Sequence, residues 1–439
     1  MMDKKQIWSI VRQMNYSLSE EEVTAKTEMI YAEIGKENYD FSNYEKNVIT
    51  QQRKKRMVYN FQRLSTESVV CQYLKRQIDK VFHINYASRS KIINVLFNIL
   101  PVIKDMNDFI IIRADFKSFF DHVLTRYVYN QYICASLMSR TDKEMLERYI
   151  VQFKYCYAGL CLSNGLTEII CRDFDERIKA KLSDHGLFFY ERYVDDILIL
   201  MNKYISQSQF LETINAVIKD VFGECPVELN MSPGKFSYIS RRNLSTIQDF
   251  NFLGYEYQIR QDHINKKISI SYGIAEKKRK KYTGIIERAF IKYKQDGNIE
   301  LFRQRLKIYS ARVVIAKTIG SSSFDWLTKG VVANYNELRF HMDSLIPHTE
   351  RFLKGLYFEL LRIHGCSMPY FLKQSASEES IYNLYSNMSR NRTLMFEENI
   401  GVSRKTLLQW IQRLDSCYTG IGKNYYRIVV DYLEKIKVE

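Results

Sequence analysis

The chain has few of the residues that make flexible linkers, and it has no long apolar run. Its 439 residues include only 5 prolines and 17 glycines, which excludes collagen-like repeats, low-complexity tails and long flexible linkers. The most apolar stretch, residues 92–103, contains Asn94, Asn98 and Pro101 and is too short to span a bilayer. The charged start Met1-Met-Asp-Lys-Lys-Gln does not resemble a secretory leader. We therefore expect a compact, soluble protein without a membrane partner.

Patterns that bind metals through sulfur or imidazole are also missing. The 8 cysteines form no Cys-x-x-Cys pair, and none of the 7 histidines has the spacing of a metal ligand. The cysteines are therefore interpreted as thiols of a reducing compartment, and a cytoplasmic location is expected.

Positive charge and aromatic rings are abundant. The chain has 65 Lys and Arg against 50 Asp and Glu, a net charge of +15, and it carries 32 Tyr and 25 Phe. This combination favours a polyanionic partner, because cations neutralise phosphates while exposed rings stack on unpaired bases. Apolar residues make up 46% of the chain, which is enough to bury a core in two or more domains.

Two adjacent carboxylates are the most informative feature. Asp195 and Asp196 lie between two apolar runs in residues 188–200, a pattern that predicts two strands joined by a tight turn. Two neighbouring negative charges repel each other unless a cation neutralises them. Mg²⁺ suits this task, since it binds one or two carboxylates and keeps positions for phosphate oxygens.

A third carboxylate follows another strand-like run. Ile110, Ile111 and Ile112 form a β-branched segment that ends at Asp115. Three carboxylates at adjacent strand ends would hold two Mg²⁺ ions, with Mn²⁺ as an alternative. In such a site one ion activates an attacking 3′-hydroxyl and the other stabilises the departing pyrophosphate. The sequence therefore predicts nucleotidyl transfer.

These segments resemble the motifs of reverse transcriptases. Asp115-Phe-Lys-Ser-Phe-Phe resembles the first palm motif, and Tyr193-Val-Asp-Asp196 resembles the third. Three further segments follow the order of that family. They are residues 159–168, in the place of the template-contacting motif, residues 229–235, which resemble the next motif with its lysine, and residues 250–255, which resemble the primer grip.

The resemblance assigns a role to each matching residue. The catalytic residues would be Asp115, Asp195, Asp196 and Lys235, with Lys235 donating a proton to pyrophosphate, and the metal-binding positions would be Asp115, Phe116, Asp195 and Asp196. The residues that bind the nucleotide would be Lys55, Arg56, Arg89 and Phe120, where Phe120 lies under the sugar and excludes a 2′-hydroxyl. The residues that contact template or primer would be Gly159, Ser163, Asn164, Phe252, Leu253 and Gly254.

Several of these positions have a plainer interpretation. The run Arg53-Lys-Lys-Arg56 is also typical of a solvated basic surface that binds nucleic acid without specificity. One of the adjacent rings Phe119 and Phe120 is expected to belong to the core.

One departure from the family pattern indicates a subgroup. Cys161-Leu-Ser163 stands where most reverse transcriptases have Pro-Gln-Gly. The Ser-Asn-Gly-Leu-Thr-Glu sequence at residues 163–168 looks more like that of bacterial defence-associated and abortive-infection reverse transcriptases than that of intron or retroviral enzymes. No retron-type Val-Thr-Gly and no integrase, RNase H or HNH pattern is present. The resemblance therefore implies an RNA template, which could be a dedicated noncoding RNA, together with dNTPs, a DNA product and a role in antiviral defence. The oligomeric state is left open.

The expected fold is an α/β right-hand polymerase with an antiparallel palm sheet, followed by an all-helical C-terminal extension. Residues 1–108 would form an N-terminal helical region and the fingers, 109–272 the palm with an interleaved fingers segment, 273–345 the thumb and 346–439 the helical extension. A capping box at Ser19 predicts a helix that Gly35 closes.

Two other functions stay open at this stage. The altered second motif would also suit template-independent or protein-primed DNA synthesis, in which a tyrosine hydroxyl is the first nucleophile. The alternative that is not an enzyme is an RNA-binding protein that has kept a palm fold but lost catalysis.

Overall fold

The computed structural model describes residues 2–15, 18–51, 54–244, 247–262, 264–319, 323–373 and 380–437. It is a mixed α/β structure with four sheets, and it divides into two compact units, residues 1–243 and 244–439. No helix in the described ranges is both long and apolar enough to cross a membrane.

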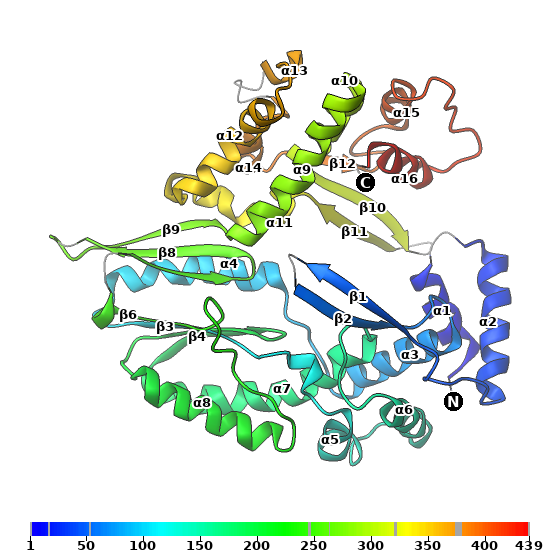
Figure 1. Ribbon diagram of the computed structural model, residues 1–439. Coiled ribbons are helices and arrows are strands. Elements are labelled where there is room, and N and C mark those ends of the chain that lie inside the picture. Colours follow the sequence, from blue (N-terminus) through cyan, green and yellow to red (C-terminus); the bar gives the residue numbers. More distant parts are fainter. Residues whose placement is uncertain are drawn as a thin grey trace. The chain divides into compact units, whose positions relative to one another are not determined.

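The central element of the first unit is a four-stranded antiparallel sheet (Figure 1). Its strands, in spatial order, are β4 (Leu187–Tyr193), β5 (Asp196–Met201), β3 (Ile110–Asp115) and β6 (Ser237–Ser240). All six residues of β3 are buried, which explains its unbroken Ile-Ile-Ile run, because both faces of this strand are covered by other elements. The strands expected at 109–115 and 188–200 are therefore confirmed.

Helices on both sides of this sheet complete its core. Figure 1 shows α8 (Gln207–Phe222) and α7 (Cys161–Leu182) below the sheet, and α4 (Arg89–Ile99) above it. The remaining helices of this unit are α1 (Lys4–Met14), α2 (Glu20–Gly35), α3 (Thr66–Val81), α5 (Thr125–Val128) and α6 (Arg140–Gln152), with short 3-10 or π turns between them. The capping box predicted for α2 is present, since Ser19 accepts from the Glu22 backbone and Glu22 accepts from the Ser19 backbone.

An antiparallel hairpin lies between α2 and α3. It consists of β1 (Glu45–Gln51) and β2 (Lys54–Asn60). The sequence predicted helices and fingers here without strands, so this hairpin was missed. Arg53 of the predicted basic run lies outside the described residues.

The second unit begins with a three-stranded meander of β7 (Ile247–Phe252), β8 (Tyr255–Gln261) and β9 (Ile268–Ile274). The long basic helix α9 (Glu276–Asp296) follows. The other helices are α10 (Ile299–Ser310), α11 (Val331–Asn334), α12 (Pro347–His364), α13 (Tyr370–Lys373), α14 (Leu384–Ser389), α15 (Arg404–Gln412) and α16 (Tyr425–Ile436).

The prediction of an all-helical C-terminal extension is wrong. Strand β12 (Thr393–Phe396) lies within it and pairs in parallel with β10 (Arg312–Ile319), which also pairs with β11 (Ser323–Lys329). This sheet forms one core with α15 and α16. The β-branched run at Val313 and Val314 explains β10, because such side chains favour a pleated, half-buried surface.

Candidate active site

The three predicted carboxylates meet at one edge of the four-stranded sheet. Asp115 is the last residue of β3, Asp196 is the first residue of β5, and the two are directly opposite each other in the antiparallel register. Asp195 lies in the two-residue turn between β4 and β5, and its carbonyl accepts a hydrogen bond of 3.2 Å from the Phe116 amide. Strand pairing therefore brings together residues that are far apart in the sequence.

Burial and mutual repulsion raise the pKa values of Asp195 and Asp196. Burial, together with the charges of Asp196 and Asp115, raises the pKa of Asp195 to about 6. Burial also raises the pKa of Asp196, although the nearby Arg113 guanidinium opposes that shift. Closely spaced carboxylates with raised pKa values are characteristic of sites that bind a cation or do acid–base chemistry.

Arg113 is a member of the site that the sequence interpretation missed. Its guanidinium donates to Asp196 and lies 3.5 Å from Asp115 Oδ2, and only 7% of its side chain is exposed. The available signal was the period of the strand, since residues two apart on β3 share one face. Its Nε is buried without a partner in the described part of the chain, so Arg113 has an unused donor at the centre of the site.

Lys235 contacts the same cluster. Its Nζ lies 2.5 Å from Asp115 Oδ2, while 41% of the lysine side chain stays exposed. Asn230, from the same segment, donates to Asp115 Oδ1 at 3.1 Å. Asp115 is itself 3% exposed. This carboxylate is thus neutralised by protein cations that a bound metal would have to replace.

The donor set suits Mg²⁺, although the carboxylates are not arranged as a preformed metal cage. Within the described ranges, no three Asp, Glu, His or Cys side chains form a group ready to hold a metal ion. The carboxylate oxygens of Asp115, Asp195 and Asp196 are nevertheless the ligands that hard divalent ions prefer. Because 41% of the Lys235 side chain is exposed, its ammonium can leave Asp115 without breaking the core.

Of the nucleotide candidates, Phe120 is the last residue of the first motif. Phe119 is the core ring of the pair, with 2% of its surface exposed, and Phe120 is half-buried next to it at a centroid distance of 5.9 Å. Lys55 and Arg56 are exposed on β2, and Arg89 begins α4. Phe120 therefore lies beside the core ring Phe119, whereas the three cations stand on other elements of the first unit.

The three residues of the second motif have different environments. Ser163 is buried in the first turn of α7, where its hydroxyl donates to the Tyr157 carbonyl at 2.8 Å. Asn164 is exposed. Gly159 has a φ of +101° and packs against β2, where the Tyr59 amide donates to the Ala158 carbonyl at 2.9 Å. The motif therefore anchors the β1–β2 hairpin, and of these three residues only Asn164 has an exposed side chain.

Gly159→Ala is expected to destabilise the first unit by roughly 2–4 kcal/mol, because a Cβ there would lie 2.4 Å from Val58 Cγ1 and 2.5 Å from the Tyr59 carbonyl at a strained φ. Thermal unfolding should show the lower midpoint. Gly35→Ala is the matched control, since a Cβ added to Gly35 would have no neighbouring described atom within 4 Å. Equal midpoints for the two variants would contradict this interpretation.

The primer-grip-like segment forms the turn of the β7–β8 hairpin in the second unit. Phe252 and Tyr255 pair across the turn, and both Leu253 and Gly254 have positive φ values, 49° and 86°. This is the backbone pattern of a type I′ turn. Phe252 is buried, so Leu253 and Gly254 are the predicted residues that the turn presents.

No protein-family model and no curated protein matches the chain. Among solved structures, the telomerase from Candida albicans in complex with the TWJ fragment of telomeric RNA is similar, with a TM-score of 0.38 and 14% identity. The match covers 89% of this chain and 64% of that chain, so this chain spans less than two thirds of the telomerase. The functional proposal rests on the carboxylate site.

Proposed function

We propose that the chain is an RNA-directed DNA polymerase that adds dNMP to a 3′ end by two-metal catalysis. The observation that carries this proposal is the meeting of Asp115, Asp195 and Asp196 at the ends of paired strands. The pKa of Asp195, raised to about 6 by burial and the other two carboxylates, supports it. A structural role alone would not concentrate three acids at one sheet edge, because their repulsion opposes folding.

Within this proposal the protein side chains bind and orient the reactants. Asp115, Asp195 and Asp196, with the Phe116 backbone, would hold Mg²⁺, which supplies activation of the 3′-hydroxyl and neutralisation of the triphosphate. Lys235, released from Asp115, would give a proton to the departing pyrophosphate. Arg113 would remain buried beside Asp196 and limit the negative charge of the site.

Basic and aromatic residues of the first unit would select the substrate. Lys55, Arg56 and Arg89 are candidates to contact the triphosphate, since guanidinium and ammonium groups pair with phosphate oxygens. A role in antiphage defence, with a dedicated noncoding RNA as template, is part of the proposal through the resemblance of the motifs.

Phe120→Ala is expected to relax selection against ribonucleotides by roughly 10-fold or more, because the smaller side chain leaves room for a 2′-hydroxyl. The measurement is the ratio of kcat/KM for dNTP and rNTP incorporation. Phe340→Ala, at a ring that is 67% exposed in the other unit, is the control. An unchanged ratio in Phe120→Ala would remove this residue from the nucleotide site.

One experiment separates the proposal from its alternatives. The purified protein is given dNTPs and Mg²⁺ before and after RNase treatment, and copurifying nucleic acid and product are sequenced. Product that depends on RNA and is complementary to it supports RNA-directed synthesis. Product that survives RNA removal indicates template-independent synthesis, and product whose mobility shifts on protease digestion indicates a protein primer. RNA binding without any product would identify a palm that has lost catalysis.

A further inference from the structure

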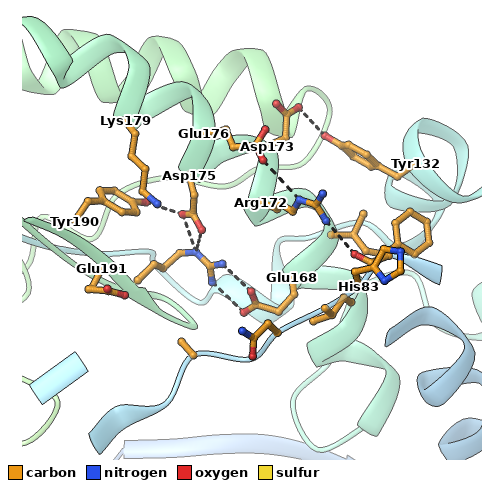
Figure 2. Close-up of a pocket in the computed structure, with 16 residues that line it drawn as sticks. His83, Tyr132, Glu168, Arg172, Asp173, Asp175, Glu176, Lys179, Tyr190 and Glu191 are labelled. Carbon is orange, nitrogen blue, oxygen red and sulfur yellow. Dashed lines mark hydrogen bonds and ion pairs between the residues drawn. The ribbon is translucent and has the colours of Figure 1, made fainter. Parts of the chain in front are cut away.

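A buried arginine lies directly behind the turn that carries Asp195. Arg192 is the penultimate residue of β4, and only 5% of its side chain is exposed. Its NH1 and NH2 donate to the two carboxylate oxygens of Glu168 at 3.0 and 2.7 Å, and its Nε donates to Asp175 at 2.9 Å. Glu168 and Asp175 both project from α7 into a cavity of about 740 Å³ (Figure 2). Two carboxylates of one helix therefore fix this guanidinium from two sides.

The same guanidinium also reaches the turn itself. Arg192 NH1 donates to the Val194 carbonyl at 3.0 Å. Val194 is the first residue of the two-residue loop between Tyr193 and Asp196, and its φ is +61°. A β-branched residue in this region is strained by about 1–3 kcal/mol, and such strain persists only where neighbouring groups hold it. The Val194 carbonyl belongs to the peptide that leads into Asp195, so its orientation fixes the direction of Asp195.

Stability alone does not explain this arrangement. A buried ion pair is often no more stable than well-packed apolar residues of the same volume, because both charges lose their hydration. What an arginine adds is a rigid fork of donors. Here all three nitrogens are used, on Glu168, Asp175 and the Val194 carbonyl. A lysine would retain the charge but could not make these contacts together.

We propose that Arg192, clamped by Glu168 and Asp175, is a positioning residue that holds the strained Val194 turn so that Asp195 faces Asp115 and Asp196. The importance of this positioning for catalysis rests on the proposed polymerase function. The contact chain runs from α7, which begins in the second motif, through Arg192 to the metal-binding turn. A displacement of α7 would thus be transmitted to Asp195.

The test uses Arg192→Lys, which retains the charge and removes the fork. Without metal or substrate, hydrogen exchange of the backbone amides in residues 193–198 should become roughly 10-fold faster than in the wild type. Arg177→Lys is the matched control, because Arg177 lies on α7, is 47% exposed and pairs with Asp173 and Asp220. The control should leave that exchange unchanged.

The Mg²⁺ dependence of dNTP incorporation is a second measurement, and a smaller amount of folded protein would not change it. The Mg²⁺ concentration for half-maximal dNTP incorporation should rise about 10-fold in Arg192→Lys, as is typical when a residue that orients a metal ligand is altered. Val194→Gly should reduce this effect, because glycine adopts a positive φ without strain. In that background, Arg192→Lys should change exchange and Mg²⁺ dependence less than it does alone.

If Arg192→Lys does not fold, Glu168→Gln is the second variant, because it removes one carboxylate charge beside Arg192 with little change in shape. It should raise both the exchange rate at residues 193–198 and the Mg²⁺ concentration for half-maximal incorporation. Wild-type exchange at 193–198 in a folded Arg192→Lys protein would overturn the proposal. The proposal would also be overturned if Arg192→Lys changed amide exchange and Mg²⁺ dependence equally in the wild-type and Val194→Gly backgrounds. Absence of any polymerase activity in the wild type would reject the proposed function but would leave the exchange test of the turn intact.

Discussion

Asp196→Asn is expected to reduce the rate of dNMP incorporation by at least about 10³-fold, which corresponds to roughly 4 kcal/mol of transition-state stabilisation. The substitution removes a negative charge and an oxygen ligand from the sheet edge where Asp115 and Asp196 lie opposite each other. It also takes away the charged partner of the buried Arg113. The measurement is single-turnover primer extension with saturating Mg²⁺.

Asp108→Asn is the control for this prediction. Asp108 precedes β3 at the opposite end from Asp115, is 20% exposed and pairs with Arg242 at 2.9 Å. The two substitutions are thus the same chemical change at a carboxylate that pairs with arginine. Asp108→Asn should retain near wild-type extension. If Asp196→Asn extends primers within 10-fold of the wild type, Asp196 is not part of a catalytic centre.

Asp195→Asn is expected to stabilise the metal-free protein, and to do so more strongly as the pH rises. Burial, with the charges of Asp196 and Asp115, raises the pKa of Asp195 from 3.8 to about 6 in the folded state. The folded state therefore binds this proton more tightly than the unfolded state, and wild-type stability falls as the pH rises from about 4 through about 6. Asparagine lacks this titration.

The expected difference in stability between Asp195→Asn and the wild type follows from the raised pKa of Asp195. Between pH 4.5 and pH 7.5, the advantage of Asp195→Asn should grow by roughly 2 kcal/mol and then stay constant. Unfolding by urea in EDTA at the two pH values measures it, with the exposed Asp184→Asn as the control. Adding Mg²⁺ at pH 7.5 should stabilise the wild type more than Asp195→Asn, since a ligand stabilises the state that binds it. A pH-independent difference would show that Asp195 is not held among other carboxylates.

The main parts of the first unit could be predicted from the sequence because their signals are local. Unbroken apolar runs at Ile110–Ile112 and Ile197–Leu200 predict buried strands, and Asp115, Asp195 and Asp196 mark their ends. The capping box at Ser19 is equally local. Such features require no knowledge of what lies opposite in space.

Other features depend on contacts between distant segments and were missed for that reason. β12 has only four residues, and its strand conformation comes from pairing with β10, which lies far away in the sequence. Helix α7 begins at Cys161 behind Leu160, which provides no side-chain cap. Without a capping residue, the sequence gives no start signal.

The site shows the same division. Three carboxylates and Lys235 were predicted. In the structure Asp115 and Asp196 face each other on paired strands, Asp195 lies in the turn before Asp196, and Lys235 contacts Asp115. The roles of Arg113 and Arg192 emerge only in the folded chain, because each arginine is defined by the carboxylates that surround it. Ser163 was predicted to contact the template, but its hydroxyl is bonded to Tyr157 inside the protein.

The most direct test of the proposed polymerase is Mg²⁺-dependent dNTP incorporation by the purified wild type and by the Asp195→Ala, Asp196→Ala double variant, each with an RNA template and a primer. The prediction is a DNA product complementary to the RNA from the wild type, with none in EDTA and none from a folded double variant. Equal incorporation by the two proteins would contradict a catalytic centre at these carboxylates.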